Sequence, residues 1–139
     1  MDEPGAQFRH PVGLLDTCVL IDLPAIAIAD LPIQSKISTV TLAELGLGVA
    51  LASDAETLAL RTERLFEIEH AFDALPFSAT AARRFTSMAK LVIAAGRKPK
   101  PRKMDLMIAA IASSNDLPLF TRNVDDFKGL EPVLTVVPL

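Results

Sequence analysis

Short apolar runs alternate along this chain with longer stretches that follow a helical pattern. Residues 12–15 are apolar, end abruptly at Asp16 and are too few for a helix, so they predict a strand buried on both faces. The β-branched run at 36–40 predicts a second strand. This alternation is typical of an α/β domain whose central, mostly parallel β-sheet is flanked by α-helices. The other expected elements are helices at 17–23, 78–95 and 104–114, two helices within 41–72, and strands at 74–77, 117–120 and 133–137.

Polar residues and a glycine mark three of the expected helix ends. Thr41 is followed three residues later by Glu44, which is the pattern of a capping box before an apolar run. Asp54 can cap the second of the two helices within 41–72. Gly96 is suited to end the helix before it. Glu44 therefore has a structural explanation that competes with any functional one.

The composition indicates one globular domain. The chain has 139 residues, of which 50% are hydrophobic and 22% charged. Residues 1–11 are polar and turn-rich and are expected to form a loose N-terminal leader. Residues 12–139 are expected to form the domain, because no repeat or low-complexity tract divides them.

Cysteine usage and hydropathy indicate the compartment. Cys18 is the only cysteine, so an internal disulfide is impossible and a reducing compartment fits best. The most apolar stretch, 12–33, is interrupted by three aspartates and two prolines, which argues against a membrane span. No secretory leader is recognisable at the start of the sequence. We therefore expect a cytoplasmic protein.

Acidic residues recur where an open parallel sheet binds its ligands. Asp16 directly follows the first strand, Glu44 lies near the start of the helix after the second strand, and Asp105 lies in the first turn of a later helix. Asn123 and Asp126 follow another expected strand. Because the carboxyl ends of parallel strands meet at one edge of a sheet, these side chains could converge there.

Converging carboxylates repel one another, and a hard divalent cation removes that repulsion. Mg²⁺ prefers carboxylate oxygens and retained waters, and it would lower the pKa of a bound water and stabilise charge on a phosphodiester. Some of the acids also have structural explanations: Asp105 can complement a helix dipole, and Asn123 and Asp126 can shape a turn. Asp16 has no structural need to be charged at the end of an apolar strand.

Four segments carry motifs: LLDTCVLID at 14–22, TLAEL at 41–45, KMDLMIAA at 103–110 and LFTRNVDDF at 119–127. In this order they resemble the motifs of PIN domains, and the closest group is the VapC-type toxins of bacterial toxin–antitoxin modules. The resemblance covers residues 14–137, almost the whole chain. It implies a PIN fold, dependence on Mg²⁺ or Mn²⁺, and endonucleolytic cleavage of RNA.

The resemblance also assigns roles to residues. It implies that Asp16 and Asp105 are the main metal ligands and that Glu44 is a third acid. Many PIN domains carry Asp at the position of Asn123, whereas this chain has Asp126 three residues later, a variant also seen among such toxins. We therefore expect Asp126 to be the fourth acid and Asn123 to be a neutral ligand or a water-positioning group. Two hydroxyls are expected to hold the carboxylates in place, those of Thr17 and Thr121.

The resemblance further implies two partners, a small cognate antitoxin of the VapB type that blocks the acidic pocket and a second copy of the toxin in a homodimer. The mean hydropathy of +0.36 is consistent with helices that have apolar surface to cover. Residues that could supply both core and partner surface are Leu42, Leu45, Leu47, Leu51, Leu58, Leu65 and Phe66.

The formal net charge of −3 argues against a nucleic-acid substrate, because proteins of that kind more often carry a basic excess. The distribution of charge weakens this objection, since five of the 14 basic residues lie in a proline-interrupted connector just before Asp105. This connector could hold RNA phosphates or could be a solvated loop. With Phe as the only aromatic residue, recognition would rest on backbone contacts more than on base stacking. The five residues are Arg97, Lys98, Lys100, Arg102 and Lys103.

Other functions fit the sequence less well. A haloacid-dehalogenase-like phosphatase with Asp16 as nucleophile normally carries a second Asp two residues later, where this chain has Cys18. Cys18 as a nucleophile would need His10 or His70 beside it, and neither lies in a motif. The same shortage of Cys and His argues against zinc. The non-enzyme alternative is a catalytically silent PIN-like module that binds RNA or protein, although all the principal acids are present.

Overall fold

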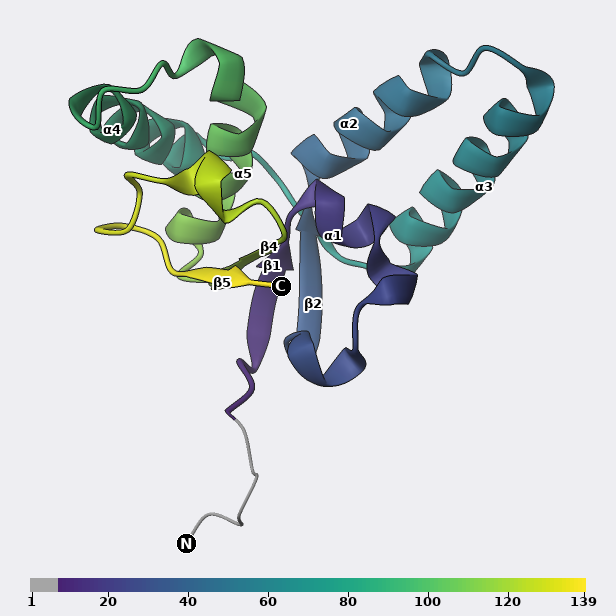
Figure 1. Ribbon diagram of the computed structural model, residues 1–139, viewed down its shortest axis with the longest axis horizontal. Coiled ribbons are helices and arrows are strands. Elements are labelled where there is room, and N and C mark those ends of the chain that lie inside the picture. Colours follow the sequence, from purple (N-terminus) through teal and green to yellow (C-terminus); the bar gives the residue numbers. More distant parts are fainter. Residues whose placement is uncertain (1–7) are drawn as a thin grey trace, which may run out of the picture.

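Residues 8–139, the part of the chain that the computed structural model describes, contain five parallel strands that form one sheet in the order β3-β2-β1-β4-β5 (Figure 1). The predicted α/β fold is thereby confirmed, with a sheet that is parallel throughout. The leader expected at 1–11 falls largely outside the described residues. The strands are β1 (Val12–Leu15), β2 (Gln34–Ser38), β3 (Ala74–Leu75), β4 (Leu119–Thr121) and β5 (Val136–Pro138). The α-helices are α1 (Thr17–Ile21), α2 (Thr39–Ala50), α3 (Ala55–Ala71), α4 (Ala79–Ala94) and α5 (Lys103–Ser114).

Strand β1 lies at the centre of the sheet. The chain runs outward from β1 through β2 to β3, and it then crosses over to build β4 and β5 on the other side of β1. Leu14 is paired with Lys36 of β2 and with Leu119 of β4. The strand order therefore reverses between β1 and β4, which is where open parallel sheets bind ligands at the carboxyl ends of their strands.

Strand β1 also separates two apolar cores. Leu14 belongs to the core beneath α4 and α5, whereas Leu15 belongs to the core that includes α1 and Phe120. Both leucines are fully buried, as expected for a strand covered on both faces. Gly13 is required in this strand because a Cβ atom there would collide with the Phe120 ring.

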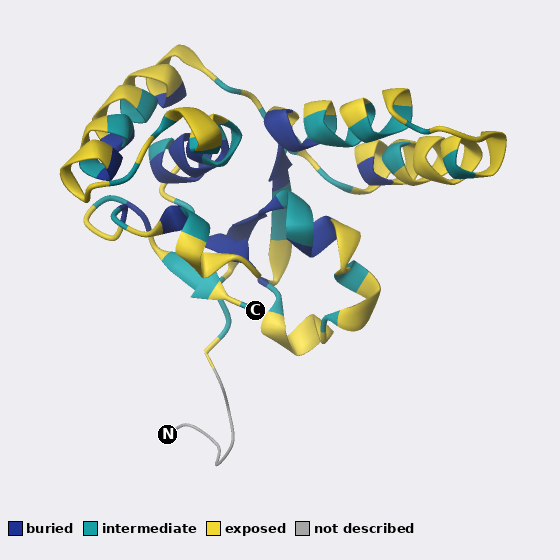
Figure 2. Cartoon of the chain, turned by 45° about the horizontal axis from the view of Figure 1, so that its top comes forward, coloured by how far each residue is buried: buried dark blue, intermediate teal, exposed yellow. Residues whose placement is uncertain are grey.

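The helices differ sharply in how deeply they are buried. Helix α5 contributes seven buried residues, and its small side chains Ala109, Ala110 and Ala112 are completely covered. Helix α3 contributes one, Ile68. Helices α2 and α3 pack side by side as a hairpin that projects from the sheet, and we call this hairpin the α2–α3 arm (Figures 1 and 2).

Two of the predicted helix caps are confirmed. Asp54 Oδ1 accepts the backbone N–H of Thr57 at 2.8 Å and starts α3. Gly96 follows α4 with φ +78°, a left-handed conformation that favours glycine. Its N–H donates to the Ile93 carbonyl and the next N–H, that of Arg97, donates to the Val92 carbonyl, which closes α4 with a Schellman motif.

The predicted capping box at Thr41 is wrong. Ser38 is the N-cap of α2, because its hydroxyl accepts the backbone N–H of Thr41 at 3.0 Å. Helix α2 therefore begins at Thr39, and Glu44 lies in its second turn instead of its first. The β-branched residues at 39 and 40 favoured a strand in the sequence, but the first turn of a helix accepts them once Ser38 supplies the cap. Capping consequently does not explain Glu44.

The remaining differences concern the ends of strands. Strands β3, β4 and β5 are shorter than the apolar runs that predicted them, because each joins its neighbour through only two or three residue pairs. The apolar residues beyond these ladders still contribute to the cores, as Leu134 does just before β5. No helix within residues 8–139 combines the length and apolar character that crossing a bilayer requires.

Candidate active site

Asp16 lies at the carboxyl end of β1 and is 4% exposed. Its Oδ1 accepts the N–H of Thr17 at 2.9 Å, so this carboxylate is also the N-cap of α1, a structural role that was not predicted from the sequence. Its Oδ2 accepts a hydrogen bond from the Thr121 hydroxyl at 2.8 Å and another from the Cys18 thiol at 3.3 Å. A buried carboxylate needs such donors, and together they hold Asp16 in one orientation at the edge of the sheet.

Thr121 reaches Asp16 because β4 ends beside β1. The N–H of Asp16 donates to the Phe120 carbonyl at 2.9 Å, which continues the ladder to the residue before Thr121 in β4. Thr121 is fully buried, and its hydroxyl also accepts the backbone N–H of Asn123 at 3.0 Å. Asn123 is exposed and contacts this network through its backbone. Thr121 thus lies where a hydroxyl that orients Asp16 is required.

Glu44 approaches the same edge from α2. Its Oε1 accepts a hydrogen bond from the Thr17 hydroxyl at 2.8 Å, which ties α2 to the residue that follows Asp16. Burial raises the pKa of the Glu44 carboxyl, the hydrogen bond from Thr17 lowers it, and the charge of Asp16 raises it further. The net result is a raised pKa, so Glu44 lies within the electrostatic reach of Asp16.

Asp105 shows most clearly that the acids converge. It is half-buried in the first turn of α5, and burial together with the charges of Asp16, Asp126 and Glu44, in that order, raises its pKa to about 6. Arg102 acts in the opposite direction. The dipole of α5 would by itself favour the charged carboxylate. Burial and the neighbouring acids thus oppose the ionised carboxylate that a helix dipole favours, so Asp105 stands in an acidic group and not only at a helix end.

Asp126 and Asn123 were the two candidates for the fourth acidic position. Asp126 is half-buried in a 3-10 helix, η4 (Val124–Phe127), and its charge contributes to the raised pKa of Asp105. The Asn123 side chain is exposed, and only its backbone N–H joins the network around Asp16. Of the two, Asp126 is the residue that the fold brings into the acidic group.

The donor set of this edge consists of oxygen atoms, which suits a hard cation. Within residues 8–139, no three His, Cys, Asp or Glu side chains are close enough to one another to hold a metal ion as shared direct ligands. Mg²⁺ usually keeps several waters and binds through one or two carboxylates together with substrate phosphates. These acids would therefore bind such an ion partly through its retained waters.

The basic connector before Asp105 divides into three parts. The Arg97 guanidinium pairs with the Asp125 carboxylate at 3.3 Å and anchors the connector to η4. Arg102 is half-buried, lowers the pKa of Asp105, and has a buried Nε without a hydrogen-bond partner among the described residues. The side chains that remain exposed are those of Lys98, Lys100 and Lys103.

Three residues of the network were not predicted from the sequence. Cys18 contacts Asp16, and its own pKa is raised by burial. Ser38 and Thr41 are fully buried and contact each other through their hydroxyls. Thr41 also contacts the Thr17 hydroxyl at 2.9 Å. The sequence gives only a weak indication of the contact between Ser38 and Thr41. Buried hydroxyl groups usually have a hydrogen-bond partner, so two hydroxyl residues after an expected strand could be expected to contact a polar group.

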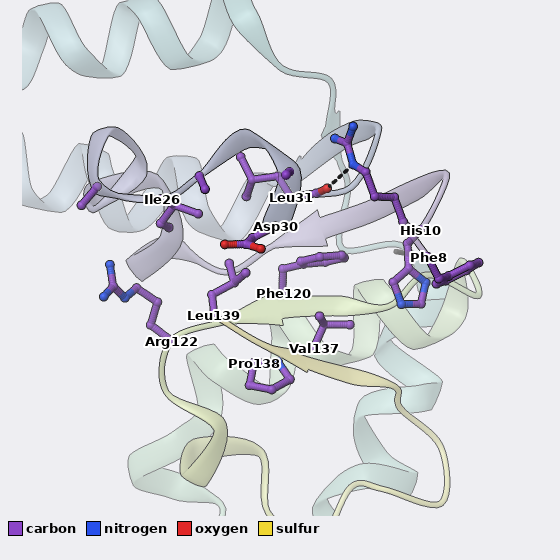
Figure 3. Close-up of a pocket in the computed structure, with 14 residues that line it drawn as sticks. Phe8, His10, Ile26, Asp30, Leu31, Phe120, Arg122, Val137, Pro138 and Leu139 are labelled. Carbon is purple, nitrogen blue, oxygen red and sulfur yellow. Dashed lines mark hydrogen bonds between the residues drawn. The ribbon is translucent and has the colours of Figure 1, made fainter. Parts of the chain in front are cut away.

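Two cavities lie near this part of the molecule. One, of about 440 Å³, lies between α1, α2 and α3 and is lined by Thr17 and Glu44 together with leucines of the α2–α3 arm and two arginines. The other, of about 490 Å³, lies over Phe120 and the end of β5, and none of the four acids lines it (Figure 3). Arg9 also lines this second cavity and donates to the Leu31 carbonyl at 3.2 Å. The acidic site therefore adjoins the first cavity.

The chain is similar to known ribonucleases over nearly its full length. It is 36% identical over 129 residues to ribonuclease VapC5 of Mycobacterium tuberculosis, a match that covers 89% of this chain and 91% of that protein. It is 38% identical over 105 residues to ribonuclease VapC8 of the same organism, covering 73% of this chain and 90% of that protein. No protein-family model matches the chain.

A solved structure agrees with these relatives. The crystal structure of VapBC-5 from Mycobacterium tuberculosis, a member of the VapBC family of toxin-antitoxin systems, superposes with a TM-score of 0.79 at 32% identity and covers 93% of this chain and 99% of that chain. The parallel sheet, its switch point and the acids gathered there define a PIN-like domain. The chain belongs to the VapC-type PIN-domain ribonucleases.

Proposed function

We propose that this protein is a Mg²⁺-dependent endoribonuclease that serves as the toxin of a type II toxin–antitoxin pair. The observation that carries the proposal is the convergence of Asp16, Glu44 and Asp126 on Asp105 at the switch point of the sheet. The repulsion among these acids is relieved by a hard cation, and the ribonuclease relatives supply the reaction. Mn²⁺ accepts the same oxygen ligands and is expected to replace Mg²⁺.

The chain's own groups divide the work at this site. Asp16 and Asp105 would hold the ion, with Glu44 and Asp126 acting as further ligands or through retained waters. A bound Mg²⁺ supplies a water of lowered pKa and charge stabilisation for the phosphodiester. Thr121 fixes the orientation of Asp16 and Thr17 fixes that of Glu44, at 2.8 Å in each case.

Basic residues next to the acids would hold the RNA backbone. Arg102 is within the electrostatic range of Asp105, so its guanidinium would place positive charge where a phosphate would bind beside the acids. The exposed lysines Lys98, Lys100 and Lys103 extend this basic surface away from the site. Arg97 would support them indirectly, because its pairing with Asp125 anchors the connector.

We also propose that a small VapB-type antitoxin covers the α2–α3 arm and the cavity beside Glu44. The arm exposes large apolar side chains, including Leu51 at 70% and Phe66 at 62%. An arginine from such a partner would suit the acidic site, because a guanidinium pairs bidentately with a carboxylate. A homodimer and a cytoplasmic location complete the proposal, by analogy with the toxin family.

The proposal is tested by cleavage of a structured RNA with purified protein, with Mg²⁺ present or removed by EDTA. We expect cleavage only with Mg²⁺ or Mn²⁺, and we expect Asp16→Asn and Asp105→Asn to abolish it without unfolding the protein. The matched control is Asp30→Asn, which removes an exposed carboxylate at the end of a 3-10 helix, outside the acidic group.

The outcome also separates the proposal from its alternatives. Variants of Asp16 and Asp105 that cleave as fast as the unaltered protein would contradict the assigned site. An unaltered protein that binds its antitoxin but cleaves no RNA would instead indicate a catalytically silent binding module. Release of phosphate from small phosphate esters, without RNA cleavage, would favour a Mg²⁺-dependent phosphatase.

A further inference from the structure

Three hydroxyl groups form a continuous chain that ends on Glu44. The Ser38 hydroxyl donates to Thr41 Oγ1 at 3.2 Å, Thr41 Oγ1 lies 2.9 Å from Thr17 Oγ1, and the Thr17 hydroxyl donates to Glu44 Oε1 at 2.8 Å. Ser38 and Thr41 are completely buried, and Thr17 and Glu44 are half-buried. The chain therefore runs from the interior toward the candidate active site.

The direction of every hydrogen bond in this chain follows from proton counting. A hydroxyl group has one proton to donate. Thr17 uses its proton on the Glu44 carboxylate, so it accepts from Thr41 in the 2.9 Å contact. Thr41 in turn accepts from Ser38, whose oxygen is occupied on its other side by the Thr41 N–H. All three hydroxyls thus point one way, toward Glu44.

Thr41 is the member that fixes this direction. It is the third residue of α2, and its position is set by the capping bond between its N–H and Ser38. Ser38 performs the capping, which leaves the Thr41 side chain free for the bond to Thr17. Without the Thr41 hydroxyl, Thr17 Oγ1 would no longer accept a hydrogen bond, and the Thr17 hydroxyl could rotate away from Glu44.

We propose that Thr41 is a positioning residue of the ribonuclease site, which orients the Thr17 hydroxyl toward Glu44 and so holds that carboxylate at the metal-binding edge. The inference rests on the proposed function. Groups that orient metal ligands from behind contribute about 10- to 100-fold in metal affinity or activity. Thr41 acts through Thr17 and touches neither metal nor RNA.

The test compares Thr41→Val, which keeps the shape of the side chain and removes its hydroxyl, with Thr41→Ser, which keeps the hydroxyl. We expect Thr41→Val to lower RNA cleavage about 10-fold or more and to raise the Mg²⁺ concentration for half-maximal rate. Thr41→Ser should restore both to near the unaltered values. The matched control is Thr39→Val, an exposed position in the same turn of α2.

A second comparison separates positioning from packing. If Thr41 acts through Thr17, adding Thr41→Val to Thr17→Val should cause little further loss of cleavage. If Thr41→Val fails to fold, Thr41→Ala removes the same hydroxyl with a smaller side chain, and it should raise the Mg²⁺ requirement in the same way. An unchanged Mg²⁺ requirement in folded Thr41→Ala would overturn the proposal.

Each remaining outcome is decisive as well. Cleavage by folded Thr41→Val at the unaltered rate and Mg²⁺ requirement would overturn this assignment and leave the proposed function intact. Equal losses in Thr41→Val and Thr41→Ser would also overturn it, because the missing group would then not be the hydroxyl. An unaltered protein without Mg²⁺-dependent cleavage would overturn the proposed function and this inference together.

Discussion

Helix α5 and the α2–α3 arm hold the acids of the same site by different means. Helix α5 buries seven residues and carries Asp105 in its first turn. Helix α3 buries only Ile68, and the arm exposes leucines at both of its helices. One side of the site is thus fixed by apolar packing, whereas the other, which carries Glu44, is fixed by hydrogen bonds near the base of the arm. The surface of the arm is correspondingly free to evolve contacts with a partner.

The largest expected effect tests whether side chains of α5 contribute more to stability than those of α3, as their difference in burial suggests. Leu106→Ala in α5 removes a side chain that is 1% exposed, and we expect it to lower the free energy of unfolding by about 2–5 kcal/mol. Leu60→Ala in α3 removes one that is 62% exposed and should change it by less than about 0.5 kcal/mol. Urea denaturation of both variants measures the difference. Equal losses would mean that the arm is part of the core after all.

The next prediction concerns the arm as a partner surface. Leu47 and Leu51 are 59% and 70% exposed, and replacing both by Ser should weaken binding of the cognate antitoxin by about 2 kcal/mol or more. The free energy of unfolding of the toxin alone should hardly change. Ile93→Ser, at a 60% exposed position on α4, serves as the control. Titration calorimetry gives the affinities, and equal binding by all three proteins would place the antitoxin elsewhere.

A smaller effect is expected at the basic connector that leads into α5. Replacing Lys98, Lys100 and Lys103 by Gln should lower RNA affinity for all sequences alike, because phosphate contacts carry no sequence information. The slope of log affinity against log salt should fall by about 2, given roughly 0.7 for each contact to single-stranded RNA. Replacing Arg83 and Lys90 of α4 is the control. The measurement uses Ca²⁺ in place of Mg²⁺, and identical slopes would show that RNA does not cross the connector.

The smallest expected effect is a pH dependence of stability caused by Asp105, the acid that α5 carries. The pKa of Asp105 is about 6 in the folded protein against 3.8 for an unperturbed group, so the folded state binds its proton more tightly than the unfolded chain does. Without metal, stability is therefore unaffected below about pH 4 and falls as the pH rises from about 4 to about 7. Because Asp105 is only half-buried and solvent screens its charge, we expect a loss of about 1 kcal/mol.

Asp105→Asn should lack this pH dependence, and Mg²⁺ should reduce it in the unaltered protein. Urea denaturation at a series of pH values between 4 and 8, in EDTA and in Mg²⁺, provides the comparison. Asp73→Asn, which removes an exposed carboxylate, should behave like the unaltered protein. A stability that rises over this pH range would contradict the raised pKa of Asp105.

Local signals in the sequence predicted much of this fold correctly. The apolar run before Asp16 is too short for a helix and forms the predicted buried strand. Asp54 starts α3 and Gly96 ends α4 through contacts within a few residues. Thr41 was assigned wrongly because two hydroxyl residues three positions apart, Ser38 and Thr41, were both eligible as caps. The choice between Ser38 and Thr41 depends on where β2 ends, which the sequence pattern does not fix.

The connections within the site could not be predicted in the same way. The contact between Thr17 and Glu44 joins residues 27 positions apart, and that between Asp16 and Thr121 joins residues 105 positions apart. Such contacts depend on how far each strand extends, which the apolar pattern leaves uncertain by one to three residues. The choice between Asn123 and Asp126 depended on the same detail, because the segment after β4 leaves Asn123 exposed and places the half-buried Asp126 within electrostatic range of Asp105.

The thiol beside Asp16 offers a way to observe this site directly. Cys18 is the only cysteine of the chain, and its Sγ lies 3.3 Å from Asp16 Oδ2. A thiol-specific dye or spin label would therefore attach at a single atom, next to the acids. Burial raises the pKa of this thiol, so labelling at neutral pH should be slow and sensitive to anything that opens or covers the edge of the sheet. Labelling rates could then follow the arrival of an ion, an RNA or an inhibitor without any engineered reporter.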